Sequence, residues 1–285
     1  MSNIRVGFIG GLADGKIVFD YVSKNKYVDL VFAITYKEDF NGARYARIES
    51  DKVSIQRTGT VKGCESIIRN SDPDLIIVAG WSELVPDEVF SIPSMGCIGF
   101  HPAKLPKDRG RSVLAWQIED GYTETALTMF KYTDYPDGGD ILAQEPIKID
   151  ETDYINDILD KIDKATLNIM RAYFPLIRQG LIKERRQDLS EGNFRRLRGA
   201  EDSVIDWNQP SRNIYNKVRA ISKPYPGATS TLNGGNIAVW RSEIVDAFPF
   251  GNESKPGTLV ATLFDGSLPY KTRDSFIRIT ESENL

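Results

Sequence analysis

The sequence predicts an α/β protein: a Rossmann-like, mostly parallel sheet domain followed by a smaller C-terminal β-rich domain with an OB-like fold. In the first part of the chain, continuous apolar runs alternate with segments of helical periodicity, which is typical of a parallel sheet with helical crossovers. From residue 227 onward, short apolar runs are separated by Gly, Asn and Pro, as in a small antiparallel domain. With 285 residues, 41% of them hydrophobic, the chain is long enough to bury two cores.

Each element of the first part has its own signal. Continuous apolar runs predict buried strands at 4–10, 28–35, 53–56, 73–80 and 97–100. The spacing of Ile17, Val18, Tyr21 and Val22 predicts a helix after the first strand, and residues 63–72 predict a second one. The strand at 97–100 ends directly before His101, where an open α/β sheet binds its ligands.

After His101 the chain continues with a helix at 112–119, a strand at 126–133, the loop "DYPDGGD" and a strand at 141–149. Regularly spaced apolar residues predict a long amphipathic helix from 152 to about 177, with Thr152 as N-cap. A helix at 211–222 precedes short strands at 227–233, 236–245, 257–264 and 276–280. We therefore expect a catalytic domain at 1–182, a polar linker at 183–202 and the β-rich domain at 203–285.

Charge and composition exclude several classes of protein. A net charge of −4 and a pI near 5.3 argue against a broad nucleic-acid or anionic-lipid surface. The sequence has no leader pattern and no apolar run of membrane length, so we expect a cytoplasmic protein without membrane contact. Cys64 and Cys97 lack CxxC spacing, so we expect two buried free cysteines and no metal site.

One glycine-rich motif near the N-terminus resembles a phosphate loop. Gly10, four residues, Gly15 and Lys16 follow the first strand, but Ile17 stands where that motif needs Ser or Thr to bind magnesium. We therefore reject nucleotide hydrolysis and interpret the glycines as a tight turn from strand to helix. Backbone N–H groups at Gly10 and Gly11 remain candidates for holding a substrate phosphate.

The loop after the fifth predicted strand contains the only histidine of the chain. A lone histidine is more often structural than catalytic, but His101 lies at a strand end and is followed by the stiffening residues Pro102 and Pro106. The loop with Asp137 follows the next predicted strand. A carboxylate beside an imidazole would form an acid/base pair.

These segments resemble the N10-formyltetrahydrofolate-dependent formyltransferases, whose pattern is Asn-x-His, a loop ending in Leu-Pro, Arg-Gly, and later Asp-x-Gly. The resemblance rests on "GCIGFHPAKLPKDRGRSVLAWQIEDGYTETALTMFKYTDYPDGGDILAQEPI" and extends to "EDSVIDWNQPSRNIYNKVRAISKPYPGA" and "KPGTLVA". It implies that His101 and Asp137 are catalytic, whereas Asp140 is structural. Gly99 matches the catalytic asparagine, whose amide holds the formyl oxygen. We expect a water in the cavity beside Gly99, a backbone N–H or Lys104 to replace that amide.

The resemblance also implies the co-substrate N10-formyltetrahydrofolate and its contacts. These are Trp81, Ser82, Glu83, Leu84, Val85, Ala103, Lys104, Leu105, Pro106, Asp134 and Gly138. Ordinary core packing is the alternative explanation for Trp81 and Leu84.

The sequence says less about the acceptor amine than about the folate co-substrate. Residues 36–56, where relatives acting on initiator tRNA carry a basic insertion, have mixed charge, so we do not expect tRNA as partner. A nucleotide-linked aminosugar, as in surface polysaccharide synthesis, is favoured, with Lys107, Arg109 and Arg111 meeting its diphosphate. Methionyl-tRNA, another small amine, and a non-catalytic folate-binding role stay open, as does a homodimer.

Overall fold

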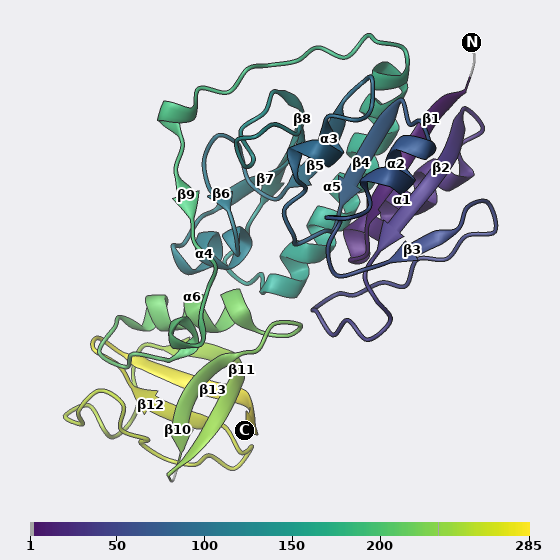
Figure 1. The fold of residues 1–285 in the computed structure, drawn as a ribbon. Coiled ribbons are helices and arrows are strands. Elements are labelled where there is room, and N and C mark those ends of the chain that lie inside the picture. The colour runs from purple at the N-terminus through teal and green to yellow at the C-terminus, as the bar shows by residue number, and fades with distance from the viewer. Residues whose placement is uncertain (1–2, 233) are drawn as a thin grey trace. The chain divides into compact units, whose positions relative to one another are not determined.

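The computed structural model describes residues 3–232 and 234–285 and contains a seven-stranded sheet in the order β3-β2-β1-β4-β5-β7-β8 (Figure 1). The chain forms two compact units. The first comprises Met1–Gly110, Ala126–Ile147 and Asp160–Phe194, and the second comprises Arg111–Thr125, Lys148–Leu159 and Arg195–Leu285. No helix among the described residues is both long and apolar enough to cross a membrane.

The sheet confirms the mostly parallel arrangement predicted from the apolar runs. Its parallel strands are β1 (Ile4–Gly10), β2 (Val28–Thr35), β3 (Ile55–Arg57), β4 (Leu75–Ala79) and β5 (Cys97–His101). β7 (Glu124–Lys131) pairs antiparallel with β5, and β8 (Ile141–Lys148) forms the edge beyond it. Because β7 is antiparallel to β5, the loop after β7 starts beside Ile98, near the beginning of β5.

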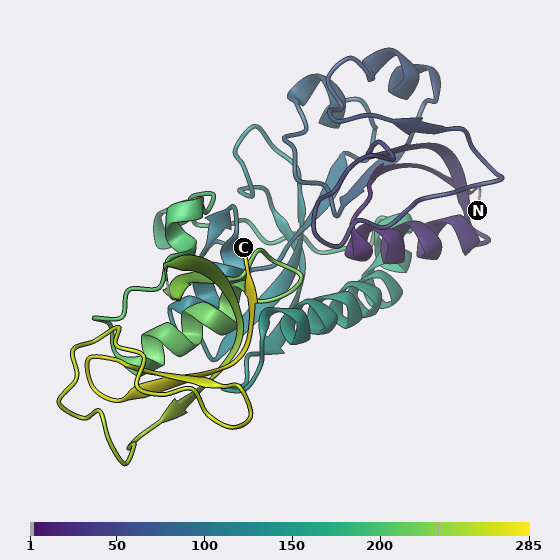
Figure 2. The same cartoon turned by 90° about the horizontal axis from the view of Figure 1, so that it is seen from below.

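Helices cover both faces of this sheet. α1 (Ala13–Lys24) and α5 (Ile155–Arg178) lie along one face, and α2 (Glu65–Asn70) and α3 (Asp87–Phe90) lie on the other (Figure 2). The prediction that Thr152 caps the long helix is wrong, because α5 begins three residues later. The carboxylate of Asp157 accepts a hydrogen bond from the Tyr154 N–H at 2.8 Å and so caps the first turn.

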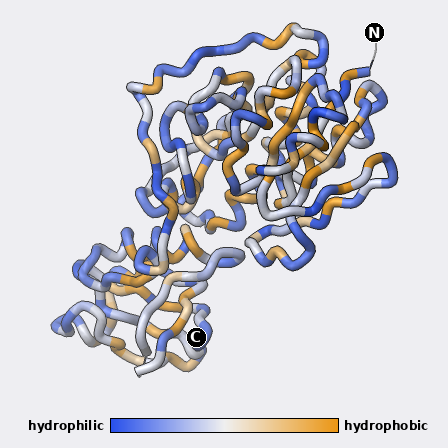
Figure 3. Tube along the Cα trace, viewed as in Figure 1, coloured by the Kyte–Doolittle hydropathy of each residue, from blue (hydrophilic) through white to orange (hydrophobic). Residues whose placement is uncertain are grey.

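Apolar side chains from the strands form the core of the first unit. The hydrophobic stretches in Figure 3 coincide with the central strands, whereas the segment after α5 is largely hydrophilic. One buried cluster consists of Ile9, Phe32, Ile34, Val61, Cys64, Ile68, Ile76, Val78, Val85, Val89 and Cys97. Cys64 and Cys97 are free and buried, as predicted.

The glycines after β1 allow helix α1 to pack against β4. A Cβ at Gly10 would lie 1.9 Å from the Ala79 carbonyl oxygen, and one at Gly15 would lie 2.3 Å from it. Lys16 pairs with Asp20 at 2.6 Å, one turn along the same helix. The interpretation as a tight turn therefore has a steric basis.

This packing predicts that Gly15→Ala destabilises the first unit. The added methyl group would clash with the rigid Ala79 backbone, so the free energy of unfolding should fall by about 1–3 kcal/mol in urea titration. Gly59→Ala is the matched control, because a Cβ there meets nothing within 4 Å. Identical unfolding midpoints for both variants would contradict the steric explanation.

The second unit is built around a four-stranded antiparallel sheet in the order β10-β11-β13-β12. Its elements are α4 (Val113–Glu119), α6 (Ser211–Ile221), β10 (Ala228–Leu232), β11 (Gly235–Val245), β12 (Leu268–Lys271) and β13 (Phe276–Asn284). The β-rich character is confirmed. The strand predicted at 257–264 is wrong, because only Leu259 bridges to Tyr270 there, and β12 was missed. Of the predicted run 227–233, residue 233 lies outside the described residues.

The segment predicted as a linker contains short ordered elements. They are η1 (Leu189–Glu191), β9 (Phe194–Arg195) and η2 (Ala200–Ser203), and β9 forms a two-stranded sheet with β6 (Arg109–Gly110). Several of its side chains contact the loops that follow β5 and β7, as described below.

Candidate active site

His101 is the last residue of β5, and its imidazole is buried with 5% exposure. Its Nε2 lies 2.7 Å from the carbonyl oxygen of Asp108. A carbonyl only accepts hydrogen bonds, so Nε2 carries the hydrogen and donates it. The other nitrogen, Nδ1, lies 3.6 Å from Oδ2 of Asp137. The ring is thus oriented at Nε2, and Nδ1 is the nitrogen left to exchange a proton.

Asp137 is held in the loop between β7 and β8 by three hydrogen bonds. The N–H of Gly110 donates to its Oδ2 at 2.8 Å. The side-chain amide of Gln187 donates to the carbonyl oxygens of Asp137 and Gly139 at 2.9 and 2.6 Å. Asp137 has a left-handed backbone with φ +54°, a conformation that these contacts support. The carboxylate therefore has a fixed position opposite His101.

Asn193, which like Gln187 lies in the segment predicted as a linker, fixes the loop after His101. Asn193 accepts a hydrogen bond from the Asp108 N–H at 2.7 Å and donates to its carboxylate at 2.9 Å. The backbone carbonyl oxygen of Asn193 accepts a hydrogen bond from the Arg109 N–H at 3.1 Å. These bonds aim the Asp108 carbonyl at the imidazole. Sequence reasoning missed Gln187 and Asn193, because single amides in a polar segment carry no spacing signal.

We expected an open cavity beside Gly99, and this expectation is wrong. The ring of Tyr132 occupies the position where a Cβ of residue 99 would lie. A Cβ there would lie 2.3 Å from Cε2 of Tyr132 and 3.2 Å from its Cζ. Burial, followed by the charges of Cys97 and Asp137, raises the pKa of Tyr132 well above its ordinary value. An aromatic ring with a neutral hydroxyl therefore fills this space.

The predicted folate loop after β4 lies against an aromatic stack. The ring of Tyr36 stacks on Trp81 at 4.3 Å and on Phe40 at 3.9 Å, and its hydroxyl accepts from the Ser82 N–H at 2.5 Å. The indole N–H of Trp81 is buried without a partner among the described residues. Leu84 is 78% exposed, so core packing does not explain it. Trp81 packs as a core residue would, yet its indole N–H is left without a hydrogen-bond partner among the described residues.

The other predicted folate contacts divide into buried supports and exposed positions. Val85, Ala103 and Leu105 are buried, Pro106 is half-buried, and Ser82, Glu83, Lys104 and Asp134 are exposed. The Ala103 carbonyl accepts from the Thr128 hydroxyl at 2.6 Å, and that of Leu105 accepts from the Gln144 amide at 3.0 Å. These two hydrogen bonds hold the turn at 103–106 in place. Gly138, directly after Asp137, is half-buried.

Of the predicted acceptor contacts, Arg109 has the most distinctive surroundings. Its guanidinium is buried, lies 5.3 Å from the ring centre of Tyr135, and donates to the Leu189 carbonyl at 3.4 Å. Its Nε and one terminal nitrogen have no partner among the described residues, which suits an anion. Lys107 is exposed in the same loop, whereas Arg111 is exposed and belongs to the second unit.

The phosphate contact predicted at Gly10 and Gly11 finds no support. The N–H groups of Gly11 and Leu12 both donate to the Gly80 carbonyl oxygen at 3.1 Å. Those amides hold the loop before Trp81 and are not free for a ligand.

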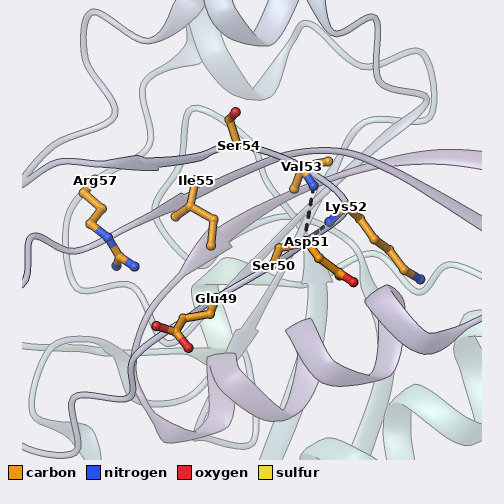
Figure 4. Close-up of a pocket in the computed structure, with 8 residues that line it drawn as sticks. All are labelled: Glu49, Ser50, Asp51, Lys52, Val53, Ser54, Ile55 and Arg57. Atoms are coloured by element: carbon orange, nitrogen blue, oxygen red, sulfur yellow. Dashed lines mark hydrogen bonds between the residues drawn. The ribbon is translucent and has the colours of Figure 1, made fainter.

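One cavity of about 730 Å³ lies away from His101 and does not define the site. Its lining residues all fall within 49–57 (Figure 4). None of the predicted site residues lies in that range.

The chain matches two family models. "Formyl transferase" covers residues 5–173, and "Formyl transferase, C-terminal domain" covers residues 199–284. A methionyl-tRNA formyltransferase of Bacillus mycoides (strain KBAB4) is 32% identical over 210 residues, which is 74% of this chain and 66% of that protein. The chain thus spans just under two thirds of that curated relative.

Solved structures share the fold over nearly the whole chain. HypX from Aquifex aeolicus in complex with tetrahydrofolic acid superposes with a TM-score of 0.70 at 19% identity, covering 99% of this chain and 44% of that one. An N-formyltransferase from Helicobacter canadensis in complex with folinic acid and dTDP-3-aminofucose gives 0.68 at 17% identity, covering 98% and 100%. At these identities the likeness concerns the fold.

Proposed function

Because the chain belongs to the formyl transferase family, we propose that it transfers the formyl group of N10-formyltetrahydrofolate to the amine of a nucleotide-linked aminosugar. The observation that carries this proposal is the His101–Asp137 pair, with 3.6 Å between Nδ1 and Oδ2 and a separate hydrogen bond holding each residue. Its position at the carboxyl end of β5 is where this class of sheet binds ligands.

The reaction forms one bond and breaks one. The amine nitrogen attacks the formyl carbon, and the bond from that carbon to N10 of the folate then breaks. The amine loses a proton and N10 gains one, so a group with an exchangeable proton is needed between them. Nδ1 of His101 fits this role, because the Asp137 carboxylate stabilises the charged imidazole while Nε2 stays bound to Asp108.

The folate is recognised, in this proposal, by the loop after β4. The Tyr36–Trp81 stack gives that loop a rigid base, and the unpartnered indole N–H of Trp81 fits a polar ring edge. Exposed Glu83 and Leu84 would offer their backbone groups, and Ser82 its carbonyl, since its N–H is donated to Tyr36.

Charge supports a small acceptor over tRNA. The stretch from 199 to 285 contains nine Lys and Arg against ten Asp and Glu, and the whole chain has a net charge of −4. A protein that neutralises many phosphates needs a basic surface. The buried, incompletely paired guanidinium of Arg109 suits one diphosphate instead. A relative of the same fold was crystallised with dTDP-3-aminofucose, which agrees with this class of acceptor.

Methionyl-tRNA is the second candidate acceptor, favoured by the 32% identity to a methionyl-tRNA formyltransferase. An acceptor panel separates the two. Tetrahydrofolate release from N10-formyltetrahydrofolate should be stimulated by nucleotide-linked aminosugars and not by charged initiator tRNA. Binding of tRNA should be weak and should vanish at physiological salt. Salt-resistant, submicromolar binding of initiator tRNA, with formylation of its methionine, would reverse the assignment.

A further inference from the structure

Tyr132 takes the place that a side chain at position 99 would occupy. Gly99 pairs with Phe130 across β5 and β7, and His101 pairs with Thr128. Directly opposite residues of paired strands have their side chains on the same face of the sheet, and so do residues two apart along one strand. His101 lies two residues after Gly99, and Tyr132 lies two residues after Phe130, so Gly99, His101 and Tyr132 lie on the same face. The 2.3 Å from the ideal Cβ of Gly99 to Cε2 of Tyr132 means that only glycine lets the ring lie there.

The ring of Tyr132 is held firmly on several sides. It stacks on Phe130 at 5.6 Å with 14° between the planes, and it tilts against Phe90 at 6.3 Å. Its N–H donates to the Cys97 carbonyl at 2.8 Å, and the side chain packs against two buried apolar clusters. A ring fixed in this way presents its hydroxyl in one place.

The hydroxyl itself is uncommitted. Within residues 3–232 and 234–285 it makes no hydrogen bond. Burial and the charges of Cys97, Asp137 and Tyr36 raise its pKa, so it remains a protonated donor at neutral pH. The ring contacts the position of Gly99, which lies two residues before His101 on the same strand and on the same face of the sheet.

The reaction needs such a donor. Negative charge grows on the formyl oxygen as the carbon becomes tetrahedral, and a positioned donor stabilises it. In the proposed mechanism both nitrogens of His101 are already engaged, because Nε2 is bonded to Asp108 at 2.7 Å and Nδ1, beside Asp137, carries the proton transfer. The donor should therefore come from another group on the same face.

We propose that the Tyr132 hydroxyl donates a hydrogen bond to the formyl oxygen, across the space left by Gly99. The proposal rests on the proposed function. Tyr132 keeps its proton throughout, while the amine proton travels by way of His101 to N10. This makes Tyr132 a catalytic residue and explains why glycine occupies position 99.

Tyr132→Phe tests the proposal, because it removes the hydroxyl and keeps the packed ring. We expect kcat to fall about 10²–10³-fold, the KM for N10-formyltetrahydrofolate to rise by no more than about tenfold, and the melting temperature to stay unchanged. Tyr27→Phe, at an exposed tyrosine outside the site, should leave kcat unchanged. A Tyr132→Phe enzyme within threefold of wild-type kcat would overturn the proposal.

A binding measurement separates this inference from the proposed function, since it needs no acceptor. Calorimetry compares N10-formyl-dideazafolate with dideazafolate, which lacks the formyl oxygen. Tyr132→Phe should weaken only the formylated ligand, by roughly threefold to tenfold. Equal weakening of both ligands, or of neither, would contradict a contact with the formyl oxygen. Absence of turnover with every amine would instead count against the proposed function alone.

Discussion

His101→Ala should lower kcat/KM for formyl transfer by about 10²–10⁴-fold. His101 is the only histidine of the chain, so no other imidazole can take over its proton transfer. Removing the imidazole also removes the group that Asp137 faces at 3.6 Å. The variant can be compared with wild type by following tetrahydrofolate release under saturating folate.

Stability and folate binding serve as controls for this variant. His101 ends a strand and borders a loop, so the melting temperature should change little, and affinity for tetrahydrofolate should persist. Turnover within tenfold of wild type would remove His101 from the mechanism.

Asp137→Asn should lower kcat on the order of 10³-fold, because it removes the charge that stabilises the protonated imidazole. The amide oxygen of asparagine can still accept from the Gly110 N–H, so the loop should keep its conformation. The rate loss therefore reports charge and not misfolding.

Asp140→Asn is the matched control for that experiment. Asp140 lies three residues further along the same loop and is the other carboxylate that the motif offers. Its carbonyl accepts from the Lys131 N–H, a contact that the substitution retains. Comparable rate losses in the two variants would show that the loop's total charge, and not Asp137, is responsible.

Much of the sheet could be predicted from the sequence because its strands are buried on both faces. β1, β2 and β4 appear as continuous apolar runs. β7 runs antiparallel to β5 and ends beside Ile98, and the loop that follows it brings Asp137 to 3.6 Å from His101. The end of α5 nearest Thr152 was predicted less well, because threonine resembles a cap locally while Asp157 supplies the contact. β12, with a proline inside four residues, has no strand signature.

The residues that sequence reasoning missed act over long separations. Gln187 reaches Asp137 across 50 residues, and Asn193 reaches Asp108 across 85. Both lie in a charged segment that resembles a linker, so only the folded chain shows their roles. Tyr132 was overlooked for a different reason: an aromatic residue in an alternating strand ordinarily indicates core packing. Only its closeness to Gly99 distinguishes it.

In the proposed reaction the His101–Asp137 centre moves a formyl group from folate nitrogen to an acceptor amine. The most direct test follows ¹³C from labelled N10-formyltetrahydrofolate by NMR in the presence of nucleotide-linked aminosugars. Wild-type enzyme should give a new formamide carbon on an aminosugar, and His101→Ala should give none above background. If wild-type enzyme binds the folate but labels no amine, or if both enzymes label it equally, the proposed reaction is contradicted.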